Sequence, residues 1–273
     1  SMDGSKTIEQ RKKLLKTCYK IIFNSAWSKK RFLEGLENKF VNSNKLLIFY
    51  QSAHKGNLSL LKKKKKWITF VGKLNKAKGY DVFVQSITKI LNKYKDWQAI
   101  VIGDEKREKI TLKHQKATIL GFKKHHEVIN IFKKTSITVA CSRWEEPFGR
   151  TSLEASANGC AVIITNKGGL PETVTDAKIL QKLNEKSLTK LISNLIENSK
   201  VRKSLQRKSI QNFYLTHKFV CKKIDDYRSE KLFLNKTFFI KSSLKSLRIL
   251  HVTNFNERLD GRLFFNTGRR INN

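Results

Sequence analysis

The chain has 273 residues, of which 57 are Lys or Arg and 22 are Asp or Glu, so its formal net charge is +35. A chain of this length can bury a core as one large domain or two small ones, and its 39% share of hydrophobic residues excludes a wholly disordered protein. No stretch approaches the ~18 uncharged apolar residues of a membrane span, and the N-terminus lacks the apolar core of a signal peptide. The four cysteines show no Cys-x-x-Cys pairing, so we expect reduced thiols and a cytoplasmic protein.

The large positive charge favours polyanionic partners such as nucleic acid or anionic lipid. The lysines are spread along the whole chain, however, and only residues 62–66 form an uninterrupted block, which we interpret as part of a solvated linker. The interleaved aromatic and basic residues of an RNA-binding sheet are absent from the strands predicted below, so we expect no nucleic-acid partner. A basic module that binds polyanions or a membrane surface without catalytic activity stays open as an alternative.

The first 66 residues predict a short alternation of helices and strands. Hydrophobic spacing favours helices over residues 7–17 and around Trp27 to Leu36, and apolar runs favour strands at residues 19–23 and 45–50. A polar break follows at residues 51–66.

From Trp67 onward, strands alternate with helices at short spacing, which predicts βαβ units and a parallel sheet with right-handed crossovers. The fold class is therefore α/β, a Rossmann-like parallel sheet with helices on both faces. The expected strands are 67–71, 97–102, 118–120, 137–140, 161–165 and 177–180, and the expected helices are 79–93, 125–133, 151–158, 185–213 and 217–232.

The last forty residues have a different character. Residues 233–246 form a connector, and residues 247–254 form an apolar strand that runs into a glycine-containing loop. Because this strand has no sheet of its own to join, we expect the region beyond residue 233 to be mobile or docked non-natively.

The segment from Glu146 to Glu154 sets two carboxylates eight positions apart around a Pro-x-Gly turn. Pro147 disfavours helical geometry at Glu146, and Gly149 frees the chain just before a helix-forming run, so the first carboxylate belongs to a loop and the second to a helix. The backbone N–H groups of Gly149, Arg150 and Thr151 would then lie at a helix N-terminus, where orphan donors and the helix dipole favour a phosphate.

A second motif, Val71-Gly72-Lys73-Leu74-Asn75-Lys76-Ala77-Lys78-Gly79, combines a strand end, two glycines and several lysines. Lys73 and Lys78 flank the turn before a predicted helix, where two ammonium groups can neutralise a diphosphate.

The run from Glu146 to Glu154 resembles the Glu-x7-Glu motif of retaining glycosyltransferases of the GT-B fold, the family 4 or "glycosyl transferases group 1" type. The trailing Gly159-Cys160-Ala161-Val162-Ile163 and the turn Lys167-Gly168-Gly169-Leu170-Pro171-Glu172 match the same family. The resemblance implies the C-terminal half of a GT-B fold. Residues 67–232 would be the nucleotide-sugar-binding domain with its crossover helix, and residues 1–66 the end of the N-terminal domain plus a linker. Residues 247–273, behind the 233–246 connector, would be the incomplete start of a second such unit.

The resemblance also implies roles for single residues. Glu146 would contact hydroxyls of the transferred sugar, Glu154 would bind the ribose hydroxyls, and Lys73, where Arg is more usual, would join Lys78 in neutralising the leaving diphosphate. The implied catalytic residues are Glu146, Lys78 and Lys73, and the implied donor-binding residues are Gly72, Lys73, Lys78, Gly121, Phe148, Gly149, Arg150, Thr151 and Glu154. We expect His125 and His126 to be capping or surface residues, and Glu172 to serve mainly loop geometry.

The expected reaction transfers a sugar with retention from a nucleotide-sugar of the UDP or GDP type to a glycan or lipid-linked acceptor, in cell-surface polysaccharide or lipopolysaccharide assembly. No Asp-x-Asp or cluster of metal ligands occurs, so we expect no metal or other cofactor. An epimerase or phosphorylase of the same fold is the nearest alternative. The residues leave the donor base, the sugar and the acceptor open. We expect peripheral contact with the inner membrane face, and we expect the chain by itself to bind its donor without transferring sugar, because the remainder of the GT-B fold is needed to close over it.

Overall fold

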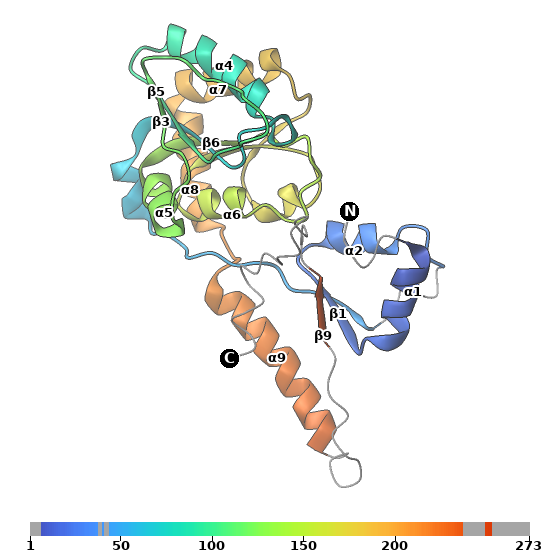
Figure 1. Cartoon of the computed structure of the whole chain (residues 1–273). Coiled ribbons are helices and arrows are strands. Elements are labelled where there is room, and N and C mark those ends of the chain that lie inside the picture. The colour runs from blue at the N-terminus through green and yellow to red at the C-terminus, as the bar shows by residue number, and fades with distance from the viewer. Residues whose placement is uncertain (1–6, 38–39, 41–43, 237–248, 253–273) are drawn as a thin grey trace. The chain divides into compact units, whose positions relative to one another are not determined.

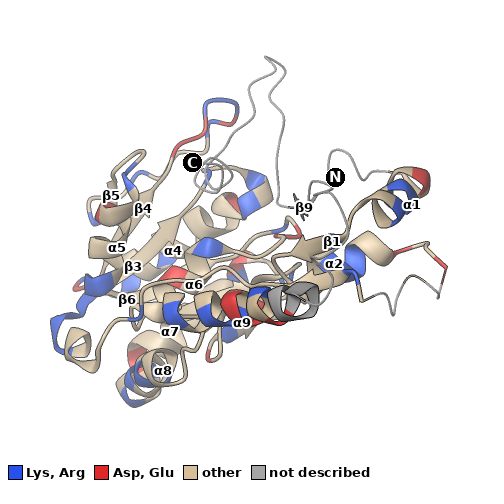
Figure 2. Cartoon of the chain, turned by 90° about the horizontal axis from the view of Figure 1, so that it is seen from below, with Lys and Arg blue, Asp and Glu red and all other residues tan. Residues whose placement is uncertain are grey.

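The computed structural model describes residues 7–37, 40, 44–236 and 249–252 (Figure 1). The chain divides into two compact units, the first made of residues 1–50 with 223–273 and the second of residues 51–222. Residues 51–66 thus belong with the second unit, and most of the long last helix, α9 (His217–Lys236), belongs with the first. Lys and Arg are distributed over helices of both units (Figure 2).

The first unit contains a small parallel sheet, the short helices α1 and α2, and most of α9. The elements α1 (Ile8–Thr17), β1 (Lys20–Phe23), α2 (Ala26–Leu33) and β2 (Leu46–Ile48) follow the predicted alternation. Thr7 and Gln10 form a capping box at the start of α1, and Ser25 caps α2 by accepting a hydrogen bond from the Ser28 amide. Burial of Phe23 against Phe32 holds α2 on the sheet.

The prediction that the C-terminal strand has no sheet to join is wrong for residues 249–252. Ile249–Val252 forms β9, which pairs in parallel with β1 and gives the strand order β2-β1-β9. The physical reason is that β1 offers one unpaired edge beside β2, and an apolar segment satisfies that edge by backbone hydrogen bonding. Residues 237–248 and 253–273 lie outside the described residues. They include the rest of the segment 247–273, which was expected to begin a second glycosyltransferase-like unit.

The second unit confirms the Rossmann-like prediction. Its six strands are all parallel, in the order β5-β4-β3-β6-β7-β8, so the first strand of this unit, β3, lies beside the fourth, β6. This order places a topological switch point between β3 and β6. The strands are β3 (Lys65–Val71), β4 (Gln98–Ile102), β5 (Ala117–Ile119), β6 (Thr135–Ala140), β7 (Ala161–Thr165) and β8 (Lys178–Leu180).

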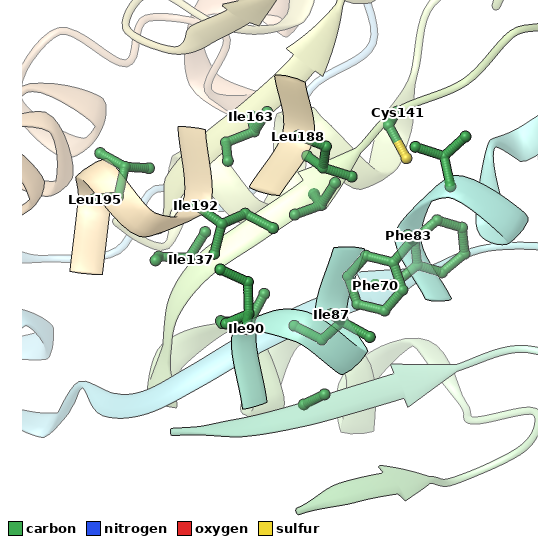
Figure 3. Packing of buried hydrophobic residues seen from close by; sticks show 14 of the residues in the cluster. Phe70, Phe83, Ile87, Ile90, Ile137, Cys141, Ile163, Leu188, Ile192 and Leu195 are labelled. Atoms are coloured by element: carbon green, nitrogen blue, oxygen red, sulfur yellow. The ribbon is translucent and has the colours of Figure 1, made fainter. Parts of the chain in front are cut away.

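Helices cover both faces of this sheet because side chains alternate along each strand. One face packs Phe70, Ile137 and Ile163 against α4 (Tyr80–Lys93) and α7 (Glu185–Glu197), as Figure 3 shows. The other face packs its side chains, Ile164 among them, against α5 (His125–Lys134) and α6 (Arg150–Ala157).

Two local predictions need correction. The single helix expected over residues 185–213 is two helices, α7 and α8 (Ser199–Gln211), because the Asn198 side chain accepts a hydrogen bond from the Val201 amide and starts a new helix. The lysine block at 62–66 is not a linker. It spans the end of a 3₁₀ helix, η1 (Leu58–Lys63), and the start of β3.

Lys64, at the centre of that block, is a structural residue. Its ammonium donates hydrogen bonds to the carbonyl oxygens of Phe132 at 2.9 Å and Asn158 at 2.7 Å, near the ends of α5 and α6. A cation at helix C-termini opposes the negative end of each dipole. Burial lowers the pKa of Lys64, although the neighbouring Cys160 acts in the opposite direction.

No helix within the described part of the chain is long and apolar enough to cross a membrane. All four cysteines are free thiols; Cys18, Cys141 and Cys160 are buried, and Cys221 is exposed. Burial raises the pKa of the Cys141 thiol to about 12.

Thiol titration tests this burial. With Ellman's reagent at pH 8, we expect Cys221 to react in seconds to minutes and the other three to react only after denaturation, because the thiolate needs both solvent access and ionisation. The Cys221→Ser variant is the control and should lose the fast phase. Fast labelling of Cys141 in the native protein would contradict the packing of the second unit.

Candidate functional site

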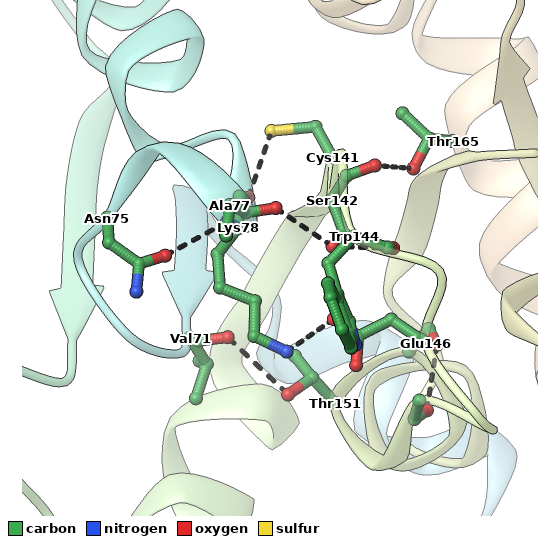
Figure 4. Close-up of polar contacts among 12 residues, drawn as sticks. Val71, Asn75, Ala77, Lys78, Cys141, Ser142, Trp144, Glu146, Thr151 and Thr165 are labelled. Atoms are coloured by element: carbon green, nitrogen blue, oxygen red, sulfur yellow. Dashed lines mark hydrogen bonds and ion pairs between the residues drawn. The ribbon is translucent and has the colours of Figure 1, made fainter. Parts of the chain in front are cut away.

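The site lies where the strand order reverses. Ligands of open parallel sheets bind outside the carboxyl ends of the strands, at the switch point. Here that point lies between β3 and β6, so the turn after β3 and the loop after β6 meet (Figure 4). The first segment carries Lys73 and Lys78, and the second carries Glu146.

The turn after β3 is closed by its own hydrogen bonds. Asn75 accepts from the Lys78 amide at 3.0 Å and so caps the short 3₁₀ helix η2 (Lys76–Lys78). Gly79, with φ of 72°, turns the chain from η2 into α4. A Cβ atom at Gly79 would lie 2.0 Å from the carbonyl oxygen of Cys141, so only glycine permits this approach of the two segments.

The loop after β6 is fastened to that turn through one carbonyl group. The Ala77 oxygen accepts hydrogen bonds from the backbone amides of Arg143 at 2.9 Å and Trp144 at 3.0 Å, and from the Ser142 hydroxyl at 3.2 Å (Figure 4). Thr165 in turn donates to the Ser142 carbonyl at 2.6 Å. Hydrogen bonds thus fix the start of this loop to the turn after β3 and to the end of β7.

A bidentate ion pair adds to this fastening. The Arg143 guanidinium donates to both carboxylate oxygens of Asp81, in the first turn of α4, at 2.6 and 2.8 Å. Burial raises the pKa of Asp81, but the hydrogen bonds and the charge of Arg143 lower it by more, so the pKa lies below its ordinary value. Asp81 is therefore ionised at neutral pH and holds α4 to the loop.

This arrangement brings Lys78 and Glu146 together, although they lie 68 positions apart in the chain. The Lys78 ammonium forms an ion pair with Glu146 Oε1 (Figure 4). The two side chains are 31% and 14% exposed, so the pair is partly shielded from water and open on one side. Two of the three predicted catalytic residues therefore occupy one location.

The third, Lys73, is exposed, and its side chain makes no hydrogen bond or ion pair with the described residues. It lies in the same turn, just after Gly72. The glycines after β3, β4 and β5 form a row at the sheet edge: a Cβ atom at Gly103 would lie 1.9 Å from the Gly72 oxygen, and the Gly103 amide donates to the Gly121 carbonyl at 2.8 Å. The predicted residues Gly72 and Gly121 thus belong to one edge.

Gly168 and Gly169 pack closely against the backbone of the loop that carries Glu146. The Gly169 amide donates to the Glu146 carbonyl at 2.6 Å. A Cβ atom at Gly168 would lie 2.2 Å from the same oxygen, and one at Gly169 would lie 2.5 Å from the Pro147 oxygen. These glycines permit close backbone packing, in agreement with the loop geometry expected for this turn.

The N-terminus of α6 follows directly. Gly149, with φ of 110°, precedes the helix, and no side chain caps it. The Thr151 hydroxyl donates to the carbonyl of Val71, at the end of β3, at 3.4 Å, so this helix end faces the same strand. Phe148, a predicted donor-binding residue, is only 2% exposed as a whole residue.

Glu154 is held by two neighbours from different helices. Its Oε1 accepts from Arg150 Nη2 at 2.8 Å and Nε at 3.1 Å, and from His125 Nε2 at 3.0 Å. His125 is a surface residue, as expected, with a side chain that is 63% exposed. The N-cap of α5 is Lys124, whose amide donates to the Glu127 carboxylate at 2.8 Å. No spacing signal links His125 to Glu154, because the contact joins two separate helices.

In the part of the chain that the structure describes, no three His, Cys, Asp or Glu side chains gather into a group that could hold a metal ion. The charged groups of the site are Lys78, Glu146, Arg150 and Glu154, with Lys73 beside them. This set can bind an anion through its cations and the helix N-terminus, and neutral hydroxyl groups through its carboxylates.

Residues 56–212 match the family model described as "Glycosyl transferases group 1". The matched range contains all the predicted site residues.

Curated relatives include proteins named as glycosyltransferases and a spore coat protein. The chain is 29% identical to spore coat protein SA of Bacillus subtilis over 53% of this chain and 43% of the relative. It is 31% identical to an uncharacterized glycosyltransferase of Methanocaldococcus jannaschii over 68% and 52%. It is 33% identical to the lipopolysaccharide core biosynthesis mannosyltransferase LpsB of Rhizobium meliloti over 41% and 34%. The chain spans about a third to a half of the length of these relatives.

Solved structures share the fold. A glycosyltransferase from Rickettsia africae superposes with a TM-score of 0.63 at 20% identity, covering 86% of this chain and 68% of that one. Anabaena HepE, solved with UDP and glucose, superposes with a TM-score of 0.64 at 17% identity, covering 82% and 68%. At these identities the likeness shows the fold, the GT-B architecture, and nothing finer.

The packing of Gly168 can be tested by substitution. Gly168→Ala should cost about 1–2 kcal/mol for the left-handed backbone and about 1–3 kcal/mol more for the clash with Glu146. Gly35→Ala is the matched control: its φ of 75° carries the same backbone cost, but the nearest atom is the tip of the Ile8 side chain, which can move. Equal losses of unfolding free energy in urea would contradict the close packing at Gly168.

Proposed function

The chain belongs to the glycosyl transferases group 1 family, and from this premise we propose that it is the donor-binding part of a retaining glycosyltransferase that uses a nucleotide-sugar. The observation that carries the proposal is the Lys78–Glu146 ion pair at the switch point of the sheet, beside the uncapped N-terminus of α6. A cation, a carboxylate and orphan backbone donors meet there.

These groups suit the chemistry of transfer from a nucleoside diphosphate. Departure of the diphosphate builds negative charge on its oxygens, and preorganised positive groups stabilise that charge most where water is partly excluded. Lys78 and the N-terminus of α6 provide two such groups, and Lys73 adds a third on the exposed side of the turn. We propose that they replace a metal cation.

The two glutamates take different parts of the donor under this proposal. Glu146, on the loop, accepts hydrogen bonds from hydroxyls of the transferred sugar, and Glu154, in the second turn of α6, accepts them from the ribose. HepE, a neighbour by fold, has been solved with UDP-glucose, and LpsB is named a mannosyltransferase of lipopolysaccharide core biosynthesis. The first name supports a nucleotide-sugar donor, and the second supports transfer of a sugar in lipopolysaccharide assembly. We propose a glycan or lipid-linked acceptor of the cell surface, met at the inner membrane face.

The direct test is isothermal calorimetry with UDP, GDP, ADP and CMP and with their sugar conjugates. One base should bind clearly better than the others. Measurements at 50 and 200 mM salt separate this site from a polyanion-binding surface, since binding through many phosphate contacts falls by orders of magnitude over that range. Failure of every nucleotide to bind would overturn the proposed function.

The two glutamates should differ in effect. Glu154→Ala should weaken binding of the diphosphate about tenfold to a hundredfold, because it removes a charged hydrogen-bond acceptor. Glu146→Ala should not weaken binding of the bare diphosphate, because no carboxylate is then left without its Lys78 partner, and it should remove the additional affinity for the intact nucleotide-sugar. Equal effects of both substitutions on the bare diphosphate would contradict the assigned roles.

Lys78 and metal dependence form a further prediction. Binding should persist in excess EDTA and fall at least about tenfold in Lys78→Ala, because the substitution removes a charged partner of the diphosphate. Lys78→Arg should bind better than Lys78→Ala because the charge survives. The matched control is Lys89→Ala, which breaks the Lys89–Glu185 ion pair between α4 and α7. A strict requirement for Mg²⁺ or Mn²⁺ would contradict the metal-free site.

A further inference from the structure

The Glu154 carboxylate accepts hydrogen bonds from the described residues through only one of its two oxygens. The side chain is 8% exposed, and three N–H donors converge on Oε1, two from Arg150 and one from His125. Oε2 accepts no hydrogen bond from the described residues. An ionised carboxylate offers about four lone-pair sites over its two oxygens. Oε2 therefore keeps acceptor capacity in a largely buried group.

Chemistry determines which group donates in the hydrogen bond between His125 and Glu154. The Arg150 guanidinium has only donors, so the Glu154 oxygen that it contacts is an acceptor. The hydrogen in the contact with His125 must then be on Nε2. His125 is thus a donor to Glu154.

The two donors come from different directions. Arg150 is four residues before Glu154 on the same helix, and a pair within one helix leaves the carboxylate free to turn about its own bonds. His125 is the first residue of α5 and reaches across to α6. A second donor on a separate element removes that freedom. The His125 side chain is 63% exposed, so burial does not explain its position.

We propose that His125 is a positioning residue that, with Arg150, fixes Glu154 so that Oε2 faces the ribose and selects ribonucleoside diphosphates over their 2′-deoxy forms. This inference rests on the proposed function, because it takes Glu154 as the ribose-binding group. The ligand class is a nucleoside diphosphate with an intact ribose 2′,3′-diol. A fixed acceptor distinguishes a diol from a deoxyribose more sharply than a rotating one, because a rotating carboxylate can adapt to the remaining hydroxyl.

The test measures a ratio of affinities. Dissociation constants for UDP and 2′-deoxy-UDP, and for GDP and 2′-deoxy-GDP, are determined by calorimetry for the wild type, His125→Phe, His125→Gln and His126→Phe. Phe keeps the ring without the donor, and Gln restores an N–H donor of similar reach. His126 is the matched control, since it is the next residue of α5, is exposed and makes no hydrogen bond with the described residues.

The wild type should bind the ribonucleotide about tenfold or more tightly than the deoxynucleotide, as expected for one hydrogen bond to a charged group. In His125→Phe the ratio should fall below about threefold, with deoxynucleotide affinity within about twofold of wild type. His125→Gln should recover part of the ratio, and His126→Phe should match the wild type.

Four results would overturn the inference. The first is an unchanged ratio in His125→Phe. The second is an equal loss for both nucleotides, which would indicate a structural role. The third is a fall in the ratio in His126→Phe, and the fourth is a wild type that binds nucleotides without preferring the ribose form. A wild type that binds no nucleotide overturns the proposed function itself, and this inference with it.

Discussion

The close approach of two backbones at the middle of the six-stranded sheet is the constraint on which the site depends. Gly79 lies against the Cys141 carbonyl, and the Ala77 carbonyl accepts two amides and a hydroxyl from the loop after β6. The strand order makes this contact possible, because β3 and β6 are neighbours in space and far apart in the chain. A side chain at position 79 would separate the segments and remove Lys78 from the reach of Glu146. The ion pair is thus a consequence of backbone packing, and its geometry is set before any ligand arrives.

The acidic side chains at the site are informative because acidic residues are scarce in this chain. With 57 basic and 22 acidic residues, cations are abundant everywhere, and carboxylates are the scarce groups. At the sheet edge each of Asp81, Glu146 and Glu154 holds a basic partner. These pairs set the positions of Arg143, Lys78 and Arg150, whereas Lys73 extends into solvent. The field of the excess lysines favours the approach of an anionic ligand from any direction, whereas the paired carboxylates determine which basic side chains are fixed at the site.

The sequence predicts the strands and helices of the second unit closely because their hydrophobic patterns are local. Ile137 and Val139 alternate with polar positions, and the Pro147-to-Gly149 turn is encoded in three residues. The contacts that complete the site are not local. Neither the His125–Glu154 hydrogen bond nor the contact of Lys64 with two carbonyls has a spacing that periodicity could detect. A lysine in a run of five carries no signal that it will be partly buried. The pairing of β9 with β1 was missed because an unpaired edge is a property of the folded sheet.

The Lys78–Glu146 pair satisfies both charges, and this determines what a donor must do to bind under the proposed function. A diphosphate that takes Lys78 leaves Glu146 without its partner, and an unpaired carboxylate at 14% exposure is costly. Hydroxyl groups of a sugar can restore the lost hydrogen bonds, whereas a bare diphosphate cannot. The free energy of binding is then the difference between the internal pair and the ligand contacts, so the intact nucleotide-sugar has an advantage beyond the area that its sugar buries. Glu146 can accept hydrogen bonds from the sugar hydroxyls only after the diphosphate has taken Lys78 from it. The diphosphate therefore binds first, and its position determines where the sugar lies.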